Sequence, residues 1–89
     1  MDEFLFSKHA EEQMLKRGIN REQVLAVVYH PDKIIVNNGE EIVIFQSIIK
    51  DERGLCLLRV FVNSSKRPMV IVTLYKTTKI AKYHEGEIR

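Results

Sequence analysis

The order of the hydrophobic patterns is what most constrains the fold of this chain. Two segments near the start have helical spacing, and the apolar segments after residue 33 are short, strand-like runs bounded by turn residues. Short connections join these runs. This order predicts an α+β fold in which two N-terminal helices pack on one face of a four-stranded antiparallel sheet.

Local signals predict two helices within about residues 7–30. Ser7 can cap the first helix, and Gly18 is placed to end it in the left-handed conformation that glycine adopts at little cost. Asn20 and Gln23 have the three-residue spacing of a capping box at the start of the second. The agreement between these signals favours a helix, a tight turn and another helix.

The sheet is expected over about residues 33–77. Asn38 and Gly39 separate two apolar runs, and this pair is the strongest short hairpin signal that a sequence offers. The strands that follow are expected at about 41–50, 55–63 and 69–75.

Alternation divides the strand residues between two faces. One face is apolar and is assigned to the helices. The opposite face also keeps about eight large apolar side chains, and an exposed apolar patch of that kind marks an interface. We therefore expect a second copy or a different protein on that face. The assignment to the helix face covers Val43, Phe45, Ile49, Cys56, Leu58, Val60, Val62, Val70, Val72 and Leu74. The assignment to the opposite face covers Ile42, Ile44, Gln46, Ile48, Leu55, Leu57, Arg59, Phe61, Met69, Ile71, Thr73, Tyr75 and Thr77.

Length and composition predict one domain over residues 1–89, because 45% apolar and 29% charged residues are ordinary for a globular chain. The acidic start and the lack of a long apolar run predict a cytoplasmic protein without membrane contact. The lone Cys56 is expected to be a buried thiol. His9, His30 and His84 fall at no metal-ligand spacing, so neither a metal nor another cofactor is expected.

Charge is distributed unevenly along the chain. Residues 1–52 hold ten acids and six bases, whereas residues 53–89 hold two acids and eight bases. A basic segment over 78–89 ends the chain. This asymmetry predicts an anionic partner for the C-terminal half, although a solvated basic surface gives the same pattern.

A basic, hydroxyl-rich cluster follows the last strand. Arg59 and Tyr75 share a face of neighbouring strands in the simplest register. Cations with aromatic rings among them suit an RNA backbone and unstacked bases. Each of these residues also has a structural alternative. A tyrosine here often packs at a sheet edge, an arginine on a sheet face often pairs with an acid, and single lysines are usually solvated. The chain adds Lys76, Thr77, Thr78, Lys79, Lys82, Tyr83 and His84 beyond the strand.

This composition suits RNA cleavage by the substrate's own 2′-hydroxyl. Such a reaction needs cations for the developing phosphorane charge and a general base and acid. Arg59 and the lysines, Lys79 among them, could stabilise that charge, and Tyr75 or His84 could transfer protons. We therefore predict Tyr75, Arg59, His84 and Lys79 as catalytic residues.

The first helix adds two candidates for RNA binding. Arg17 lies within about 60 degrees of Ala10 and Met14 on a helical period, so its stem falls on the stripe meant for the core. His9 flanks the same stripe. The structural alternative for Arg17 is a salt bridge or capping of helix carbonyls. The predicted RNA-binding set is Lys76, Thr77, Thr78, Lys82, Tyr83, Arg17 and His9.

Three motifs resemble a known family. SKHAEEQMLKRGINREQV, HPDKII and VTLYKTTKIAKY are similar to the bacterial domain-of-unknown-function family 4258, which itself resembles RelE-like ribonuclease toxins. The resemblance implies a RelE-like fold, RNA cleavage without metal and neutralisation by a protein antitoxin. Gln13 departs from the family pattern, which often has arginine there. The matching positions are His9, Ala10, Met14, Arg17, Gly18, Ile19, Tyr75, Thr77, Thr78, Lys79, Lys82 and Tyr83.

These observations lead to one expected function and two alternatives. The expected function is a metal-independent endoribonuclease of toxin type. One alternative is a binding module that uses the basic end for nucleic acid or an acidic partner, without catalysis. The other is a dimerisation domain that uses the apolar sheet face.

Overall fold

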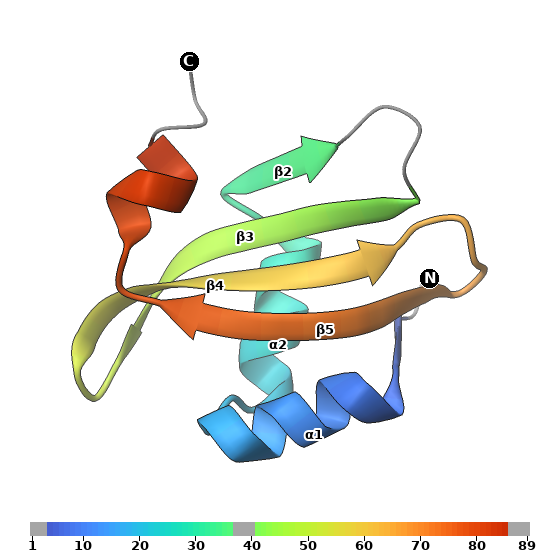
Figure 1. Ribbon diagram of the computed structural model, residues 1–89, viewed down its shortest axis with the longest axis horizontal. Coiled ribbons are helices and arrows are strands. Elements are labelled where there is room, and N and C mark those ends of the chain that lie inside the picture. Colours follow the sequence, from blue (N-terminus) through green and yellow to red (C-terminus); the bar gives the residue numbers. More distant parts are fainter. Residues whose placement is uncertain (1–3, 37–40, 86–89) are drawn as a thin grey trace.

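The computed structural model describes residues 4–36 and 41–85, with side chains through Tyr83. Within these residues five strands form one sheet in the order β1-β5-β4-β3-β2, and two helices cover one of its faces (Figure 1). A short π-helical turn, η1, follows the last strand. The bounds are β1 Phe4–Phe6, α1 Lys8–Arg17, α2 Arg21–Tyr29, β2 Lys33–Val36, β3 Ile42–Asp51, β4 Gly54–Asn63, β5 Met69–Thr77 and η1 Ala81–Glu85.

The predicted mixed α+β architecture is confirmed, but the prediction of four antiparallel strands is wrong. The fifth strand is β1, which pairs parallel to β5 with Phe4 opposite Met69. Three residues are too short to show a strand period, and their pairing partner lies more than sixty positions away in the sequence. The side chains of Phe4 and Phe6 pack against the core.

The first helix begins and ends where its sequence predicts. The Ser7 hydroxyl accepts a hydrogen bond from the Ala10 amide at 3.0 Å, and Gly18 ends the helix with φ of 66°. The same hydroxyl donates to the Val72 carbonyl at 2.8 Å, and the Ser7 amide donates to the Ile71 carbonyl. Ser7 therefore caps α1 and also fixes its start to β5.

The second helix has the predicted capping box. The Asn20 side chain accepts from the Gln23 amide, and the Gln23 side chain accepts from the Asn20 amide. Three valines of α2 are buried against the sheet, namely Val24, Val27 and Val28. The ridge that they form holds α2 beneath β3 and β4.

The strands β3, β4 and β5 begin and end within two residues of their expected bounds. The predicted Asn38 and Gly39 turn lies outside the described residues. On either side of it, β2 and β3 pair antiparallel, with Val36 opposite Val43. Leu58, Val60 and Leu74 are buried under the helices, as the alternation predicted.

The alternation is wrong at the start of β5 because the strand contains a bulge. Phe61 pairs with Thr73, but the next residue, Val62, pairs with Ile71, so Val72 is an extra residue. The bulge turns Ile71 into the core, where the sequence pattern had placed Val70 and Val72. Met69 likewise packs against the core rather than lying on the opposite face.

The face of the sheet away from the helices, here called the outer face, differs from the expectation in its apolar side chains, and Val70, opposite Asn63, joins it. Ile71 and Met69 leave it through the bulge, and Leu57 is fully buried. Ile48 and Leu55 remain exposed at one end. A protein partner on this face stays a prediction.

Over 4–36 and 41–85, no helix is both long and apolar enough to cross a bilayer.

Candidate functional site

A row of polar side chains crosses the outer face from β2 to β5. Lys33 lies opposite Gln46, Gln46 lies opposite Arg59, and Arg59 lies opposite Tyr75. Directly opposed residues project from the same face of a sheet, so these four form one line, here called the polar row. The predicted pairing of Arg59 with Tyr75 is confirmed.

Arg59 is the centre of the polar row and is only 6% exposed. Its Nε donates to Gln46 Oε1 at 2.9 Å, and its Nη1 donates to Tyr75 Oη at 2.9 Å. Its guanidinium carbon also lies 5.7 Å from the ring centre of Phe61 and 5.9 Å from that of Tyr75. These hydrogen bonds and aromatic contacts hold the guanidinium in one orientation.

The η1 turn covers Arg59. The ring centre of Tyr83 lies 4.6 Å from the Arg59 guanidinium carbon, within the range of a cation–π contact. The Tyr83 carbonyl accepts from Gln46 Nε2 at 3.2 Å, and its ring packs edge-on to Tyr75 at 6.3 Å. The C-terminal segment is thus bound to the outer face and carries an aromatic side chain into the site.

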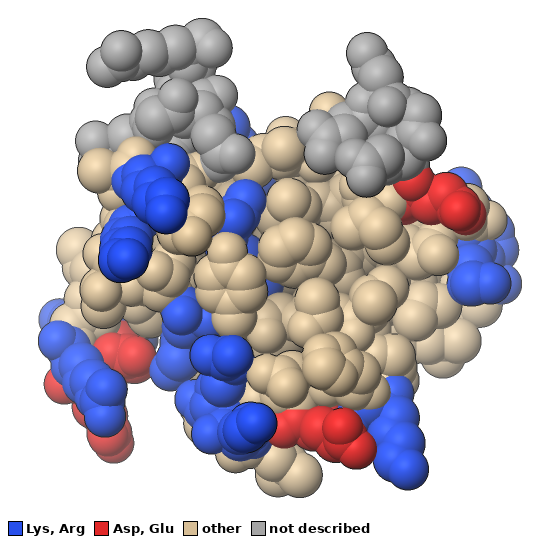
Figure 2. Space-filling view, viewed as in Figure 1, with Lys and Arg blue, Asp and Glu red and all other residues tan. Residues whose placement is uncertain are grey.

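Positive charge surrounds this part of the outer face. Figure 2 shows Lys and Arg gathered at the left side of the face, whereas its middle is mostly uncharged. Lys79 and Lys82 are both exposed on the segment that includes η1, and Lys82 Nζ lies 5.1 Å from the centre of the Tyr83 ring. Lys82 therefore brings a positive charge next to Tyr83, whose ring packs against Tyr75.

The structure brings some predicted catalytic residues together and separates others. Arg59 and Tyr75 are in direct contact. Lys79 has an exposed side chain, and its amide donates to Thr77 Oγ1 at 3.1 Å, which shapes the turn after β5. His84 lies in η1, but its side chain is outside the described residues.

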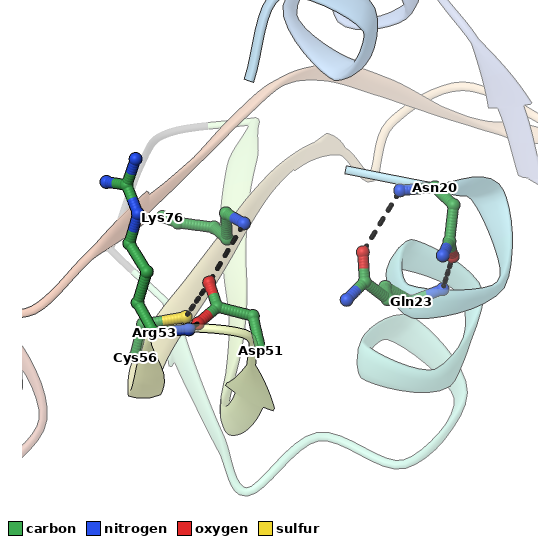
Figure 3. A network of polar contacts seen from close by, with 6 residues as sticks. All are labelled: Asn20, Gln23, Asp51, Arg53, Cys56 and Lys76. Carbon is green, nitrogen blue, oxygen red and sulfur yellow. Dashed lines mark hydrogen bonds and ion pairs between the residues drawn. The ribbon is translucent and has the colours of Figure 1, made fainter. Parts of the chain in front are cut away.

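Lys76 lies on the helix side of the sheet, because alternation turns it away from Tyr75. Its Nζ forms an ion pair with Asp51 at 3.1 Å (Figure 3). The Arg53 amide also donates to Asp51, and this bond followed by the Lys76 contact lowers the pKa of the Asp51 carboxyl. Lys76 therefore stabilises the β3–β4 turn and does not belong to the polar row.

Cys56 is buried, as predicted, and lies beside the same carboxylate. Its Sγ is 3.7 Å from Asp51, and burial raises the pKa of the thiol, with the neighbouring negative charge acting in the same direction. A thiol with a raised pKa is a poor nucleophile at neutral pH. This cysteine has a structural role.

A cleft of about 630 Å³ is lined by four of the predicted RNA-binding residues. It lies between the start of α2 and the β3–β4 turn; Figure 3 shows Asn20 and Gln23 on one side and the Asp51 network on the other. The predicted set is therefore divided between the outer face, with Lys82 and Tyr83, this cleft, and His9, which lies at neither. The predicted residues that line the cleft are Arg17, Lys76, Thr77 and Thr78.

The two candidates from α1 do not reach the polar row. Arg17 is exposed, and its Nε donates to Gln13 Oε1 at 2.9 Å, which is neither the salt bridge nor the carbonyl contact considered from the sequence. Met14 packs against the core, whereas Arg17, the last residue of α1, is exposed. His9 is exposed on α1.

Sequence reasoning missed Gln46 and Lys33 as members of the site. Gln46 was assigned to the outer face but given no role, although a lone amide within the apolar run IVIFQSII is a signal of a specific polar contact. Lys33 could be placed only once the β2–β3 register was known. Among the described residues, no group of three or more His, Cys, Asp or Glu side chains could hold a metal ion.

Comparison with known proteins agrees with the sequence motifs. No curated protein and no solved structure was found to match the chain. A family model described as a domain of unknown function, DUF4258, matches residues 6–79, which include Arg59, Tyr75 and Lys79 but end before Tyr83. Because this match spans most of the sequence, the chain belongs to the DUF4258 family.

Proposed function

We propose that this protein is a metal-independent endoribonuclease of toxin type, with a fold related to that of the RelE-like ribonucleases. The observation that carries the proposal is the hydrogen bond from Arg59 to Tyr75 beneath Tyr83, with Lys82 beside the Tyr83 ring. A cation, a phenol and an aromatic face are the groups that RNA cleavage on a sheet face would need.

The chemistry requires two proton transfers around one phosphate. The 2′-hydroxyl oxygen attacks phosphorus as a base removes its proton, and the bond to the 5′-oxygen breaks as an acid protonates that oxygen. The products are a 2′,3′-cyclic phosphate and a 5′-hydroxyl. Tyr75 serves one proton transfer, because its oxygen already accepts from Arg59 and its own O–H is directed elsewhere. His84 is proposed for the other.

Charge stabilisation and positioning fall to the residues around Tyr75. Arg59, Lys79 and Lys82 supply positive charge for the phosphorane oxygens, and Tyr83 supplies a ring on which a base can stack. Substrate must approach from the solvent side of Tyr75 and Tyr83, since both side chains are partly exposed while Arg59 is buried. Arg59 would therefore act chiefly by orienting and polarising Tyr75.

The burial of Arg59 favours a second candidate, a binding module without catalysis. A guanidinium that donates to Gln46 and Tyr75 and is covered by Tyr83 fits a purely structural role equally well. Lys79 and Lys82 would then bind RNA on the exposed side of η1. The two candidates differ in whether the phenol of Tyr75 is needed.

The proposal is tested by incubating the purified protein with single-stranded RNA in excess chelator. Cleavage with 2′,3′-cyclic phosphate ends is expected, and Tyr75→Phe should lower its rate by about 10²-fold or more with little change in RNA affinity. Tyr29→Phe is the matched control, because Tyr29 lies at the end of α2 and packs against Phe4.

Two results would separate the candidates. Intact RNA in the presence of folded protein would overturn the nuclease proposal, and retained RNA binding would then favour the binding module. Equal cleavage by the Tyr75→Phe and Tyr29→Phe variants would remove Tyr75 from the mechanism.

A further inference from the structure

Gln46 is the member of the polar row that donates a hydrogen bond to the backbone of η1. It is fully buried, with 0% exposure, in the middle of β3. Its Oε1 accepts from Arg59 Nε at 2.9 Å, and its Nε2 donates to the Tyr83 carbonyl at 3.2 Å. One amide therefore contacts both the buried cation and the turn that covers it.

We propose that Gln46 is a positioning residue that sets the orientation of Arg59 and the docking of η1 at the same time. The two contacts need opposite hydrogen-bonding groups, an acceptor toward Arg59 and a donor toward the Tyr83 carbonyl. Among side chains of this length, an amide supplies both without carrying charge. This explains why a glutamine occupies a buried position in an otherwise apolar strand.

The consequence of the proposal concerns the location of Tyr83. The ring of Tyr83 contacts both Arg59 and Tyr75, and the adjacent Lys82 is part of the same turn. Loss of the hydrogen bond from Gln46 to the Tyr83 carbonyl would let the Tyr83 ring and the Lys82 ammonium move away from the Arg59–Tyr75 pair. The role of η1 in RNA cleavage rests on the proposed function, but the docking of η1 does not.

Two variants of Gln46 separate its two contacts. Gln46→Glu keeps an acceptor for Arg59 but removes the donor and brings a carboxylate oxygen toward the Tyr83 carbonyl. Gln46→Met has a similar volume and removes both contacts. The matched control is Gln23→Glu, because Gln23 uses only its Oε1 in the capping box and a glutamate can replace it there.

NMR measurements give one readout for each contact. The Tyr83 amide, which donates to the Lys79 carbonyl within the turn, reports docking through its rate of hydrogen exchange. The Arg59 Nε–H signal reports the contact with residue 46. Core amides of β4 report whether each variant is folded.

The expected result is about tenfold faster exchange at Tyr83 in both Gln46 variants. The Arg59 Nε–H signal should stay protected in Gln46→Glu and be lost in Gln46→Met, while Gln23→Glu changes neither. Unchanged Tyr83 exchange in Gln46→Met would overturn the proposal, because it would show that Gln46 acts only by filling space. Faster Tyr83 exchange in Gln46→Glu alone would also overturn the proposal, since the burial of a negative charge would then be the cause.

Cleavage of RNA by the same variants separates this inference from the proposed function. If the protein is a nuclease, both Gln46 variants should lose activity and Gln23→Glu should keep it. If no variant and no wild-type protein cleaves RNA, the exchange and Nε–H measurements still decide the role of Gln46.

Discussion

At the scale of single residues, side chains that make two contacts at once explain most of this structure. Ser7 accepts from the Ala10 amide and donates to the Val72 carbonyl, so one hydroxyl joins α1 to β5. Gln46 joins Arg59 to Tyr83 in the same manner. For Ser7 the local cap can be predicted from the sequence, whereas both contacts of Gln46 are with residues on other elements and depend on the fold.

Replacing Ser7 tests this double role. Ser7→Ala should lower the free energy of unfolding by about 2 kcal/mol, because it removes a helix cap worth about 1 kcal/mol and a second hydrogen bond of similar size. Asn20→Ala removes only the local cap of α2 and should cost about half as much. Urea unfolding of both variants measures the difference. Equal losses would contradict a stabilising contact between Ser7 and β5.

At the scale of elements, the bulge in β5 decides which side chains enter the core. In a regular strand without a bulge, the alternation that puts Leu74 under the helices would also put Val72 and Val70 there. The bulge instead presents Ile71 to the core and brings the Val72 carbonyl to Ser7. The pairing of β1 with β5 begins in this same region.

Deleting Val72 should therefore leave the sheet intact. The pairs Phe61 with Thr73 and Val62 with Ile71 would become neighbours in a regular ladder, and Ile71 would stay in the core. The expected loss is about 1 kcal/mol, from the hydrogen bond of Ser7.

A deletion in a regular strand gives the contrast. Loss of Ile44 from β3 would move every following side chain of that strand to the other face and should prevent folding. Circular dichroism and thermal melting distinguish the two variants. Complete unfolding on deletion of Val72 would show that the bulge is needed for the register.

At the scale of the whole molecule, the sheet separates two environments. Helices α1 and α2 cover an apolar face (Figure 1), and η1 contacts the polar row of the outer face through Tyr83. The basic C-terminal half of the sequence supplies the exposed lysines beside that end. The electrostatic attraction of an anion should therefore depend on the positions of these exposed lysines on the surface and not on net charge alone.

Salt titration of RNA binding tests this asymmetry. If the protein binds single-stranded RNA through Lys79 and Lys82, replacing both with glutamine should reduce the slope of log affinity against log salt by about 1.4. The control replaces Lys8 and Lys16, which are exposed on α1, and removes the same charge. Equal effects of the two pairs would show that binding is nonspecific.

The candidate site was predictable in part. Arg59 and Tyr75 could be placed together because alternation assigns both side chains to the same face of neighbouring strands. Their direct pairing also depends on the bulge, which shifts the register by one residue between the turn and Arg59. The same alternation places Lys76 on the face opposite to Tyr75, although both residues were predicted as members of one cluster. Tyr83 was predicted to bind RNA, but its position over Arg59 depends on how η1 packs back onto the sheet. No local sequence pattern indicates that packing.

Local signals were enough to predict the helix bounds, the antiparallel strands and the helix face of β4, because caps, glycines and side-chain periodicity act over a few residues. The parallel pairing of β1, the bulge at Val72 and the contact of η1 with the polar row appear only in the folded chain. These features depend on hydrogen bonds between residues distant in sequence, whose formation is set by the packing of the whole chain.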